Sequence, residues 1–172
     1  MFDHKNIKNE QLQHFLKGTM SDTLGMEIVE LGENFLTMKM PVDHRTIQPY
    51  GILNGGASMA LAETVASYAG NILVRSEDKY CVGLEINGNH TKSVREGFVY
   101  GTATPIHIGK RTHVWNIDIK DEEGDLVCKS RMTLAVFPNP KWIHHQIYIL
   151  GSVQVVTFYG YVNQAKIKSF VS

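Results

Sequence analysis

Apolar and polar residues follow two different periods in the first forty residues of the chain. Apolar residues recur at helical spacing over residues 9–17, which predicts a short amphipathic helix. Apolar-rich runs over 26–31 and 35–40 predict two strands, and Gly32-Glu33-Asn34 between them is typical of a hairpin turn. A loop punctuated by proline and glycine follows over 41–51.

Residues 57–74 form the most distinctive segment of the chain. Apolar residues occur on nearly every face of a helix drawn through this segment, alanine is frequent and proline is absent. A helix of this composition has little polar surface to turn toward water. We therefore expect a long helix that the rest of the protein buries.

After this helix, the spacing of apolar residues changes to a pattern typical of β-strands. Four segments rich in β-branched and aromatic residues are separated by turn residues, and they span 80–86, 97–104, 112–120 and 126–137. The order is a short helix, two strands, a long buried helix and four strands. This order favours an α+β fold in which an antiparallel β-sheet wraps around a long central helix.

Length and composition narrow this picture to a globular protein. The chain has 172 residues, 43% hydrophobic and 20% charged, which is enough for one sizeable core and too little for two ordinary domains. Lysine plus arginine and aspartate plus glutamate number 17 each, but every acidic residue lies at or before Asp125. The first 125 residues are therefore slightly acidic, which argues against nucleic acid as a partner.

Neither the cysteines nor the apolar segments indicate a secreted or membrane protein. Cys81 and Cys128 are too few for a disulfide framework and are not spaced for zinc. The N-terminus lacks the apolar segment of a secretory signal, and the apolar-rich stretch 147–162 is shorter than the ~20 residues of a membrane span. We expect a cytoplasmic protein without a membrane partner.

A polar stripe interrupts the apolar helix. Glu63, Ser67 and Asn71 follow one another at intervals of four residues, so they share one helical face. A buried carboxylate is costly unless it is paired or useful, which makes Glu63 a candidate acid, base or nucleophile. Two structural alternatives stay open: the stripe meets solvent, or a structural partner satisfies the carboxylate.

The start of the same helix is a second candidate. Asn54-Gly55-Gly56 place glycines where free N–H groups and the helix dipole suit an anion or a developing oxyanion. A tight turn that needs glycine is the structural alternative. Glu63 lies roughly 10 to 12 Å from this terminus by helical rise. The substrate must therefore lie along the helix, or another subunit must supply one of the two groups.

Several spaced motifs resemble those of hotdog-fold acyl-CoA thioesterases of the phenylacetate or aryl-CoA type. The motifs are the run from His44 to Ser67, the run from Gly83 to His90, Arg95-Glu96-Gly97, the run from His107 to Lys110, and Val114-Trp115. The resemblance covers roughly residues 10–138 and agrees with the fold expected from the patterning. The most similar group includes the 1,4-dihydroxy-2-naphthoyl-CoA thioesterases of menaquinone synthesis.

The resemblance implies a hydrolase that cleaves a small, aromatic acyl-CoA to the free acid and CoA. It implies that Glu63 is the nucleophile or general base, and that Ser67 helps to position the attacking water. Gln48 and the amides of Gly55 and Gly56 are then expected to bind the thioester carbonyl. A homodimer or homotetramer with sites at the dimer interface is expected. CoA enters as part of the substrate, with no separate cofactor and no metal.

The resemblance also implies a set of contacts to CoA. These are expected from His90, Ser93, Arg95, His107, Gly109, Lys110 and Arg111. Basic residues in this set are suited to phosphate groups, as point charges or as forks. Surface lysines in turns are also commonly only solvated, which is the alternative for Lys110.

One residue departs from the family pattern. Asn54 stands where members of this type usually carry a histidine that donates to the carbonyl. Asparagine keeps an N–H₂ donor but cannot become charged, so we expect weaker activity or a shifted substrate. A catalytically weak or inactive acyl-CoA binding module is therefore the alternative function. A hotdog hydratase would need a histidine and an acid at a spacing that this sequence lacks.

The resemblance divides the chain into a thioesterase domain over 1–138 and a C-terminal extension over 139–172. The extension is rich in β-branched and aromatic residues, so it could add a hairpin to a sheet edge or between subunits. A non-native extension, such as a shifted reading frame, is the alternative. We expect deletion of residues 141–172 to leave hydrolysis intact.

Overall fold

Ten segments of regular secondary structure build the protein between Asn9 and Pro138. The computed structural model describes residues 2, 7 and 9–138, so the predicted extension over 139–172 lies outside the described residues. In chain order the elements are α1 (Asn9–His14), α2 (Met20–Thr23), β1 (Glu27–Leu31), β2 (Leu36–Pro41), α3 (Gly55–Val74), a 3₁₀ turn (Arg75–Glu77), β3 (Lys79–His90), β4 (Phe98–Ile108), β5 (Thr112–Lys120) and β6 (Leu126–Pro138).

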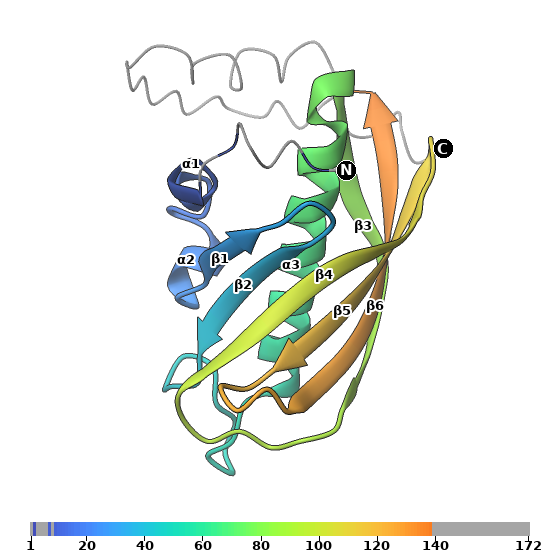
Figure 1. Ribbon diagram of the computed structural model, residues 1–172. Helices are drawn as coiled ribbons and strands as arrows, with labels where there is room; N and C mark the ends of the chain where they lie inside the picture. The colour runs from blue at the N-terminus through green and yellow to red at the C-terminus, as the bar shows by residue number, and fades with distance from the viewer. Residues whose placement is uncertain (1, 3–6, 8, 139–172) are drawn as a thin grey trace, which may run out of the picture. The chain divides into compact units, whose positions relative to one another are not determined.

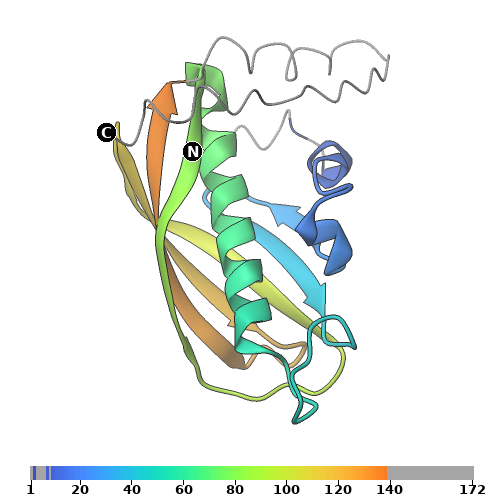
Figure 2. The ribbon, with the colours of Figure 1, turned by 180° about the vertical axis from the view of Figure 1, so that it is seen from behind.

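The strands of the described chain form one antiparallel sheet around α3. Their order across the sheet is β1-β2-β4-β5-β6-β3, and every neighbouring pair is antiparallel. The sheet curves around α3, which lies across its concave face (Figure 1 and, from behind, Figure 2). The predicted α+β hotdog architecture, an antiparallel sheet wrapped around a long central helix, is confirmed.

Alternation along the strands buries the core between the sheet and α3. In β5, Trp115, Ile117 and Ile119 are fully buried, whereas the residues between them are partly exposed. The two-residue period of a strand places every second side chain on the concave face. Of the 20 residues of α3, only Gly56 and Glu63 are exposed. Eight of the others are buried and ten are half-buried, so most of the helix is shielded from water, as its composition predicts.

One edge of the sheet, formed by β3, is long and has no neighbouring strand within the described chain. β3 pairs with β6 on one side, and its other side has no strand beside it. Two of its apolar residues, Val82 and Leu84, are 45% and 62% exposed. This free side is called the β3 edge below. Asn71 of α3 bonds to the N–H and the C=O of Cys81. Beyond Cys81, the β3 edge is a template for pairing with another chain, because an edge strand presents backbone N–H and C=O groups on its free side.

Several element boundaries differ from the predicted ones. β3 continues to His90 and β4 to Ile108, beyond their predicted ends. Pairing with β6 and β5 holds both extensions, because tertiary pairing overrides the weak strand propensity of glycine, asparagine and proline. α3 begins earlier than predicted, at Gly55, since Asn54 caps it. The four residues of α2 are too few to produce a periodic signal.

Within the described residues, no helix is long and apolar enough to cross a membrane.

Candidate active site

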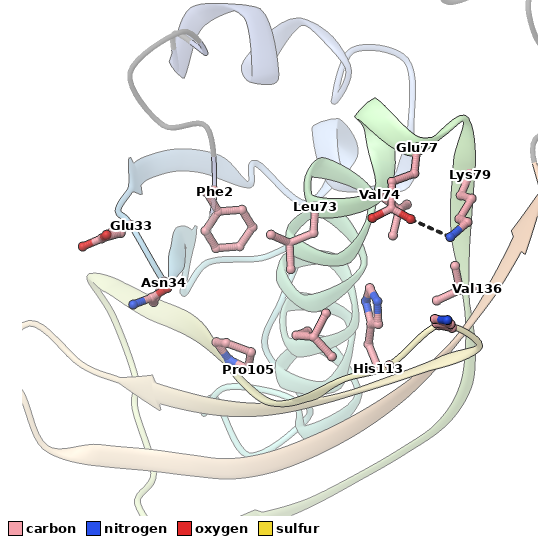
Figure 3. A pocket seen from close by; sticks show the side chains of 13 residues that line it. Phe2, Glu33, Asn34, Leu73, Val74, Glu77, Lys79, Pro105, His113 and Val136 are labelled. Atoms are coloured by element: carbon pink, nitrogen blue, oxygen red, sulfur yellow. Dashed lines mark hydrogen bonds and ion pairs between the residues drawn. The ribbon is translucent and has the colours of Figure 1, made fainter.

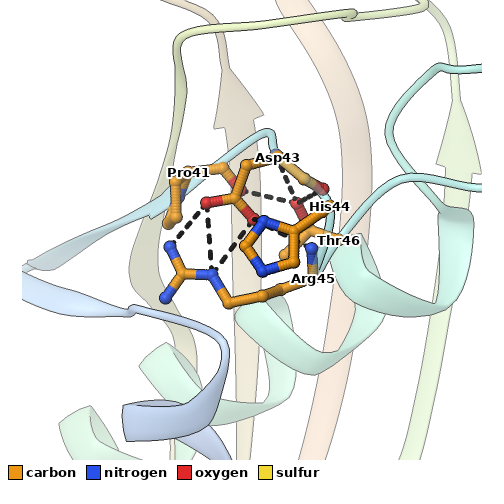
Figure 4. Close-up of polar contacts among 5 residues, drawn as sticks. All are labelled: Pro41, Asp43, His44, Arg45 and Thr46. Carbon is orange, nitrogen blue, oxygen red and sulfur yellow. Dashed lines mark hydrogen bonds and ion pairs between the residues drawn. The ribbon is translucent and has the colours of Figure 1, made fainter.

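A hydrogen-bonded loop joins β2 to α3 and carries the first candidate residue, Gln48. The Asp43 carboxylate accepts hydrogen bonds from the Arg45 backbone N–H at 2.9 Å and from Nη2 of its guanidinium at 2.6 Å (Figure 4). The Thr46 hydroxyl donates to the carbonyl of Pro41 at 2.7 Å. Hydrogen bonds from Arg45 lower the pKa of Asp43 from 3.8 to about 2, so this carboxylate stays charged at neutral pH. These contacts fix the path of the chain toward Gln48.

The turn after Gln48 orients its side chain. The side-chain oxygen of Gln48 accepts from the Tyr50 N–H at 3.1 Å, and no described residue accepts from its NH₂ group. That NH₂ group is therefore available as a donor to a ligand. The Arg95 guanidinium donates to the carbonyl of Tyr50 at 3.2 Å and, more weakly, to that of Gly51 at 3.5 Å. Arg95 thus holds the Gln48 turn, while its predicted contact with CoA stays a prediction.

The start of α3 offers an unoccupied backbone donor at Gly55. Asn54 is the N-cap, and its side-chain oxygen accepts from the N–H of Gly56 at 2.7 Å. The Gly56 amide, predicted to bind the thioester carbonyl, is therefore already taken. No described residue accepts from the N–H of Gly55. The Gly55 amide is therefore open to an oxyanion at the positive end of the helix dipole.

The end of β3 brings a histidine to the same terminus. His90 faces the start of α3 so closely that a Cβ added at Gly55 would lie 2.9 Å from its Nε2. Glycine at this position therefore leaves the room that the imidazole occupies. Ser93 lies exposed in the segment that links β3 to β4. The structure thus gathers Gln48, Gly55 and His90 at one end of the domain.

Glu63 lies in the middle of α3 and is exposed, so the prediction of a buried carboxylate is wrong for the single chain. The polar stripe faces β3, and because β3 is an edge strand, no further strand of the described chain covers the stripe. The Glu63 carboxylate makes no hydrogen bond or ion pair with a described residue. Its Oε1 lies against β3, where a Cβ added at Gly83 would be 3.0 Å away.

The other two residues of the stripe have different surroundings. Asn71 spans to β3, where its Oδ1 accepts from the Cys81 N–H at 2.9 Å and its Nδ2 donates to the Cys81 carbonyl at 3.2 Å. Asn71 therefore has a structural role, because it pairs with the strand as a neighbouring backbone would. Ser67 is half-buried one turn from Glu63, and its hydroxyl has no hydrogen-bond partner among the described residues.

Gly55 and Glu63 lie on the same face of α3 but do not meet within one chain. The eight residues between them correspond to about 12 Å of helical rise. A carbonyl bound at the Gly55 amide is therefore too far from the carboxylate of its own helix for direct attack.

The remaining residues predicted to contact CoA lie at the opposite end of α3. Gly109 and Lys110 line a cavity of about 480 Å³ beside the last turn of the helix (Figure 3). His107 and Arg111 flank the same turn between β4 and β5 and are exposed. One chain does not bring these residues together with Gly55. Their contacts with CoA stay a prediction.

A buried histidine lines this cavity. His113 is 1% exposed, and its Nδ1 lies 3.8 Å from Sγ of Cys81. Burial lowers the pKa of His113 and raises the pKa of Cys81 to about 11, so both side chains are neutral at pH 7. Neither His113 nor Cys81 provides a carboxylate, which the Glu63 face of α3 does. Across the described residues, no cluster of His, Cys, Asp and Glu could hold a metal ion.

Sequence reasoning missed the residues that hold the Gln48 turn in place. Asp43 followed three residues later by Thr46 is a turn pattern, because both side chains can bond to nearby backbone groups. That pattern could have been found from sequence. The role of Arg95 could not, since its partners lie more than forty residues earlier in the chain.

Comparisons with known proteins converge on one family. Residues 50–128 match the thioesterase superfamily. Over 132 residues the chain is 46% identical to the 1,4-dihydroxy-2-naphthoyl-CoA hydrolase of Escherichia coli, covering 77% of this chain and 96% of that protein. Over 133 residues it is 47% identical to the proofreading thioesterase EntH of Cronobacter turicensis, with the same two coverages. A crystal structure of a thioesterase from Haemophilus influenzae matches with a TM-score of 0.78 and 45% identity, covering 82% of this chain and 98% of that one.

Proposed function

We propose a substrate and a catalytic group for this chain. The chain belongs to the thioesterase superfamily and is a thioester hydrolase of hotdog fold, and the proposal starts from that fact. The proposed reaction is hydrolysis of a small, aromatic acyl-CoA to the free acid and CoA. One observation carries the proposal: an unoccupied Gly55 amide and an unpaired Glu63 carboxylate share one face of α3, beside the β3 edge.

Two donors are placed to hold the thioester carbonyl. The Gly55 N–H lies at the positive end of the α3 dipole, and the Gln48 NH₂ group is held at the same end of the domain. Negative charge grows on the carbonyl oxygen as the carbonyl carbon is attacked. Each donor aimed at this charge lowers the barrier by on the order of 3 kcal/mol.

Glu63 supplies the carboxylate for the attack, by one of two routes. As a general base it takes a proton from water while the water oxygen bonds to the carbonyl carbon, and the C–S bond then breaks to release the CoA thiolate, which is protonated. As a nucleophile it bonds to the carbonyl carbon itself and expels the thiolate, and water then cleaves the resulting anhydride. In both routes the Ser67 hydroxyl, one turn along α3, can orient the water.

A second copy of the chain would complete this site. If the β3 edges of two copies pair antiparallel about a twofold axis, the two α3 helices lie side by side in opposite directions. The N-terminus of one α3 then approaches the polar stripe of the other. Gly55 and Glu63 of one site would therefore come from different subunits. The proposed assembly is a homodimer, or a homotetramer of such dimers.

Two similarities favour an aromatic acyl group. The motifs from His44 to Ser67 resemble those of aryl-CoA thioesterases, and the Escherichia coli relative is named a 1,4-dihydroxy-2-naphthoyl-CoA hydrolase. Menaquinone biosynthesis in the cytoplasm is the setting that this similarity suggests. The comparisons do not favour an inactive acyl-CoA binding module, because the relatives named above are hydrolases.

Thiol release from a panel of acyl-CoA esters tests the proposed substrate. We expect kcat/KM for benzoyl-CoA and a naphthoyl-CoA to exceed that for acetyl-CoA and hexanoyl-CoA by about tenfold or more, as a shaped apolar pocket allows. Equal values across the panel would contradict the aromatic assignment. Tight binding of every ester without thiol release would instead support the alternative function, an inactive acyl-CoA binding module.

Replacing Asn54 by histidine is expected to raise kcat on an aryl-CoA by about threefold to tenfold, a small part of what one oxyanion donor supplies. The change removes the cap on the Gly56 N–H and adds a ring donor on the carbonyl side. Loss of the cap costs about 1 kcal/mol of stability, so rates are compared where both proteins are folded.

The Asn54→Ala variant separates the two effects, because it releases the Gly56 amide without adding a donor. A rise in both variants assigns the gain to the amide, and a rise in Asn54→His alone assigns it to the ring. An unchanged or lower kcat in folded Asn54→His would contradict the expectation.

A further inference from the structure

The strand beside Glu63 contains an irregularity that decides which of its side chains face α3. From Lys79 to Gly83, β3 pairs in step with β6, and the register then shifts between Gly83 and Glu85. Such a shift is a β-bulge, in which Leu84 is the extra residue. A bulge reverses the alternation of side chains for the rest of the strand, and bulges are frequent next to active sites.

The bulge lets residues on both of its sides face the same helix. Before the bulge, a side chain at Gly83 would point at Glu63. After the bulge, His90 faces Gly55 at the start of α3. Positions 83 and 90 differ by an odd number, so a regular strand would turn them to opposite faces. The bulge therefore lets β3 meet the candidate acid and the candidate carbonyl site at once.

At Gly83 the strand leaves room for the Glu63 carboxylate. A Cβ added there would lie 3.0 Å from Oε1 of Glu63 and 2.8 Å from Cε of Met132. Met132 is 1% exposed and packed in the core, whereas Glu63 is exposed. An added methyl group would therefore displace the carboxylate more readily than the methionine, which has little space to move into.

We propose that Gly83 is a positioning residue for Glu63. The absent Cβ gives the carboxylate a place against the β3 backbone, at the side of α3 that faces the β3 edge. The proposal rests on the proposed function, in which Glu63 attacks the thioester or activates water. It adds that glycine at position 83 sets the geometry of that carboxylate, although glycine has no side chain to take part in the reaction.

Substitution of Gly83 by alanine tests the proposal. We expect kcat to fall by about fivefold to tenfold, because the carboxylate must move by a few tenths of an ångström from its place, with KM within about twofold of its original value. The control is Gly101→Ala in β4, where an added Cβ would meet Leu61 of α3 at 3.1 Å and no part of the polar stripe. It makes a comparable steric demand in the core, and its kcat should stay within about twofold.

A double variant separates positioning from a general structural defect. In a Glu63→Gln background there is no carboxylate to misplace, so adding Gly83→Ala should lower kcat no further. An equal further loss in that background would overturn the proposal, as would wild-type kcat in folded Gly83→Ala. If Glu63→Gln keeps wild-type activity, the proposed function itself fails. If Gly83→Ala does not fold, Gly83→Ala/Met132→Val provides the missing space and is tested in the same way.

Discussion

Replacing Glu63 by glutamine is expected to lower kcat for thiol release by about 10³-fold or more, because the amide neither accepts a proton nor attacks a carbonyl. Glutamine keeps the size of the side chain, and the position is exposed, so the fold and the packing of α3 should be preserved. Binding of the ester should therefore survive. Thiol release measures the first effect, and titration calorimetry with a non-hydrolysable CoA thioether measures the second.

A matched control for this variant is Glu30→Gln on β1, which removes the same charge at the opposite edge of the sheet. Its kcat should be unchanged. A Glu63→Gln enzyme within tenfold of the wild-type rate would remove Glu63 from the reaction. A single turnover in heavy-oxygen water then distinguishes the two routes in the wild type. A general base places the label in the acid product at once. A nucleophile takes the label into the Glu63 carboxylate when water attacks the Glu63 carbonyl carbon of the anhydride, so label found in Glu63 establishes the nucleophilic route.

The fold follows from two periodicities that a sequence displays directly. Alanine-rich apolar residues over 57–74 produced a buried helix because no polar face was available to water. Strict alternation over 112–120 produced a strand with one buried face. The strand ends were less visible, because Gly88 and the residues beside it have weak strand propensity and are held by pairing with β6. Pairing partners are a property of the fold rather than of the local sequence.

The site was predictable in its residue types and less so in its geometry. The helical spacing of Glu63 and Ser67 could be read from sequence, but their exposure depends on β3 being an edge strand. The Asn54 cap was foreseeable from its residue type, yet its consequence for the Gly56 amide needs the observed hydrogen bond. The bulge after Gly83 leaves no signal in the pattern, because it reverses the alternation within a strand that already mixes polar and apolar residues.

Introducing a charge at the β3 edge, as Leu84→Glu, is expected to separate the subunits and abolish hydrolysis together. Leu84 is 62% exposed in the single chain and lies on the β3 edge. A charge on an edge strand is a common means of preventing strand pairing, because the charge would have to lose its hydration when a second strand docks beside it. Light scattering should then report the 19.3 kDa mass of one chain.

The loss of activity in Leu84→Glu should be nearly complete, since a single chain holds Gly55 and Glu63 about 12 Å apart. Val29→Glu is the control, because Val29 is a 39%-exposed residue of the other edge strand, β1. The molecular mass and the kcat of Val29→Glu should equal those of the wild type. A monomeric Leu84→Glu enzyme with the wild-type rate would contradict the shared site.

Mixing two inactive variants tests the shared site without disturbing assembly. Glu63→Gln and Gln48→Ala each lack one half of the machinery, so neither homodimer has a working site. In a heterodimer, one of the two sites combines the intact Gln48 of one chain with the intact Glu63 of the other. Random exchange should therefore restore about a quarter of the wild-type rate, because half of the dimers carry one working site in two. Recovery to this level requires that the two residues act across an interface, whereas a mixture that stays inactive after subunit exchange would place both halves of the site in one chain.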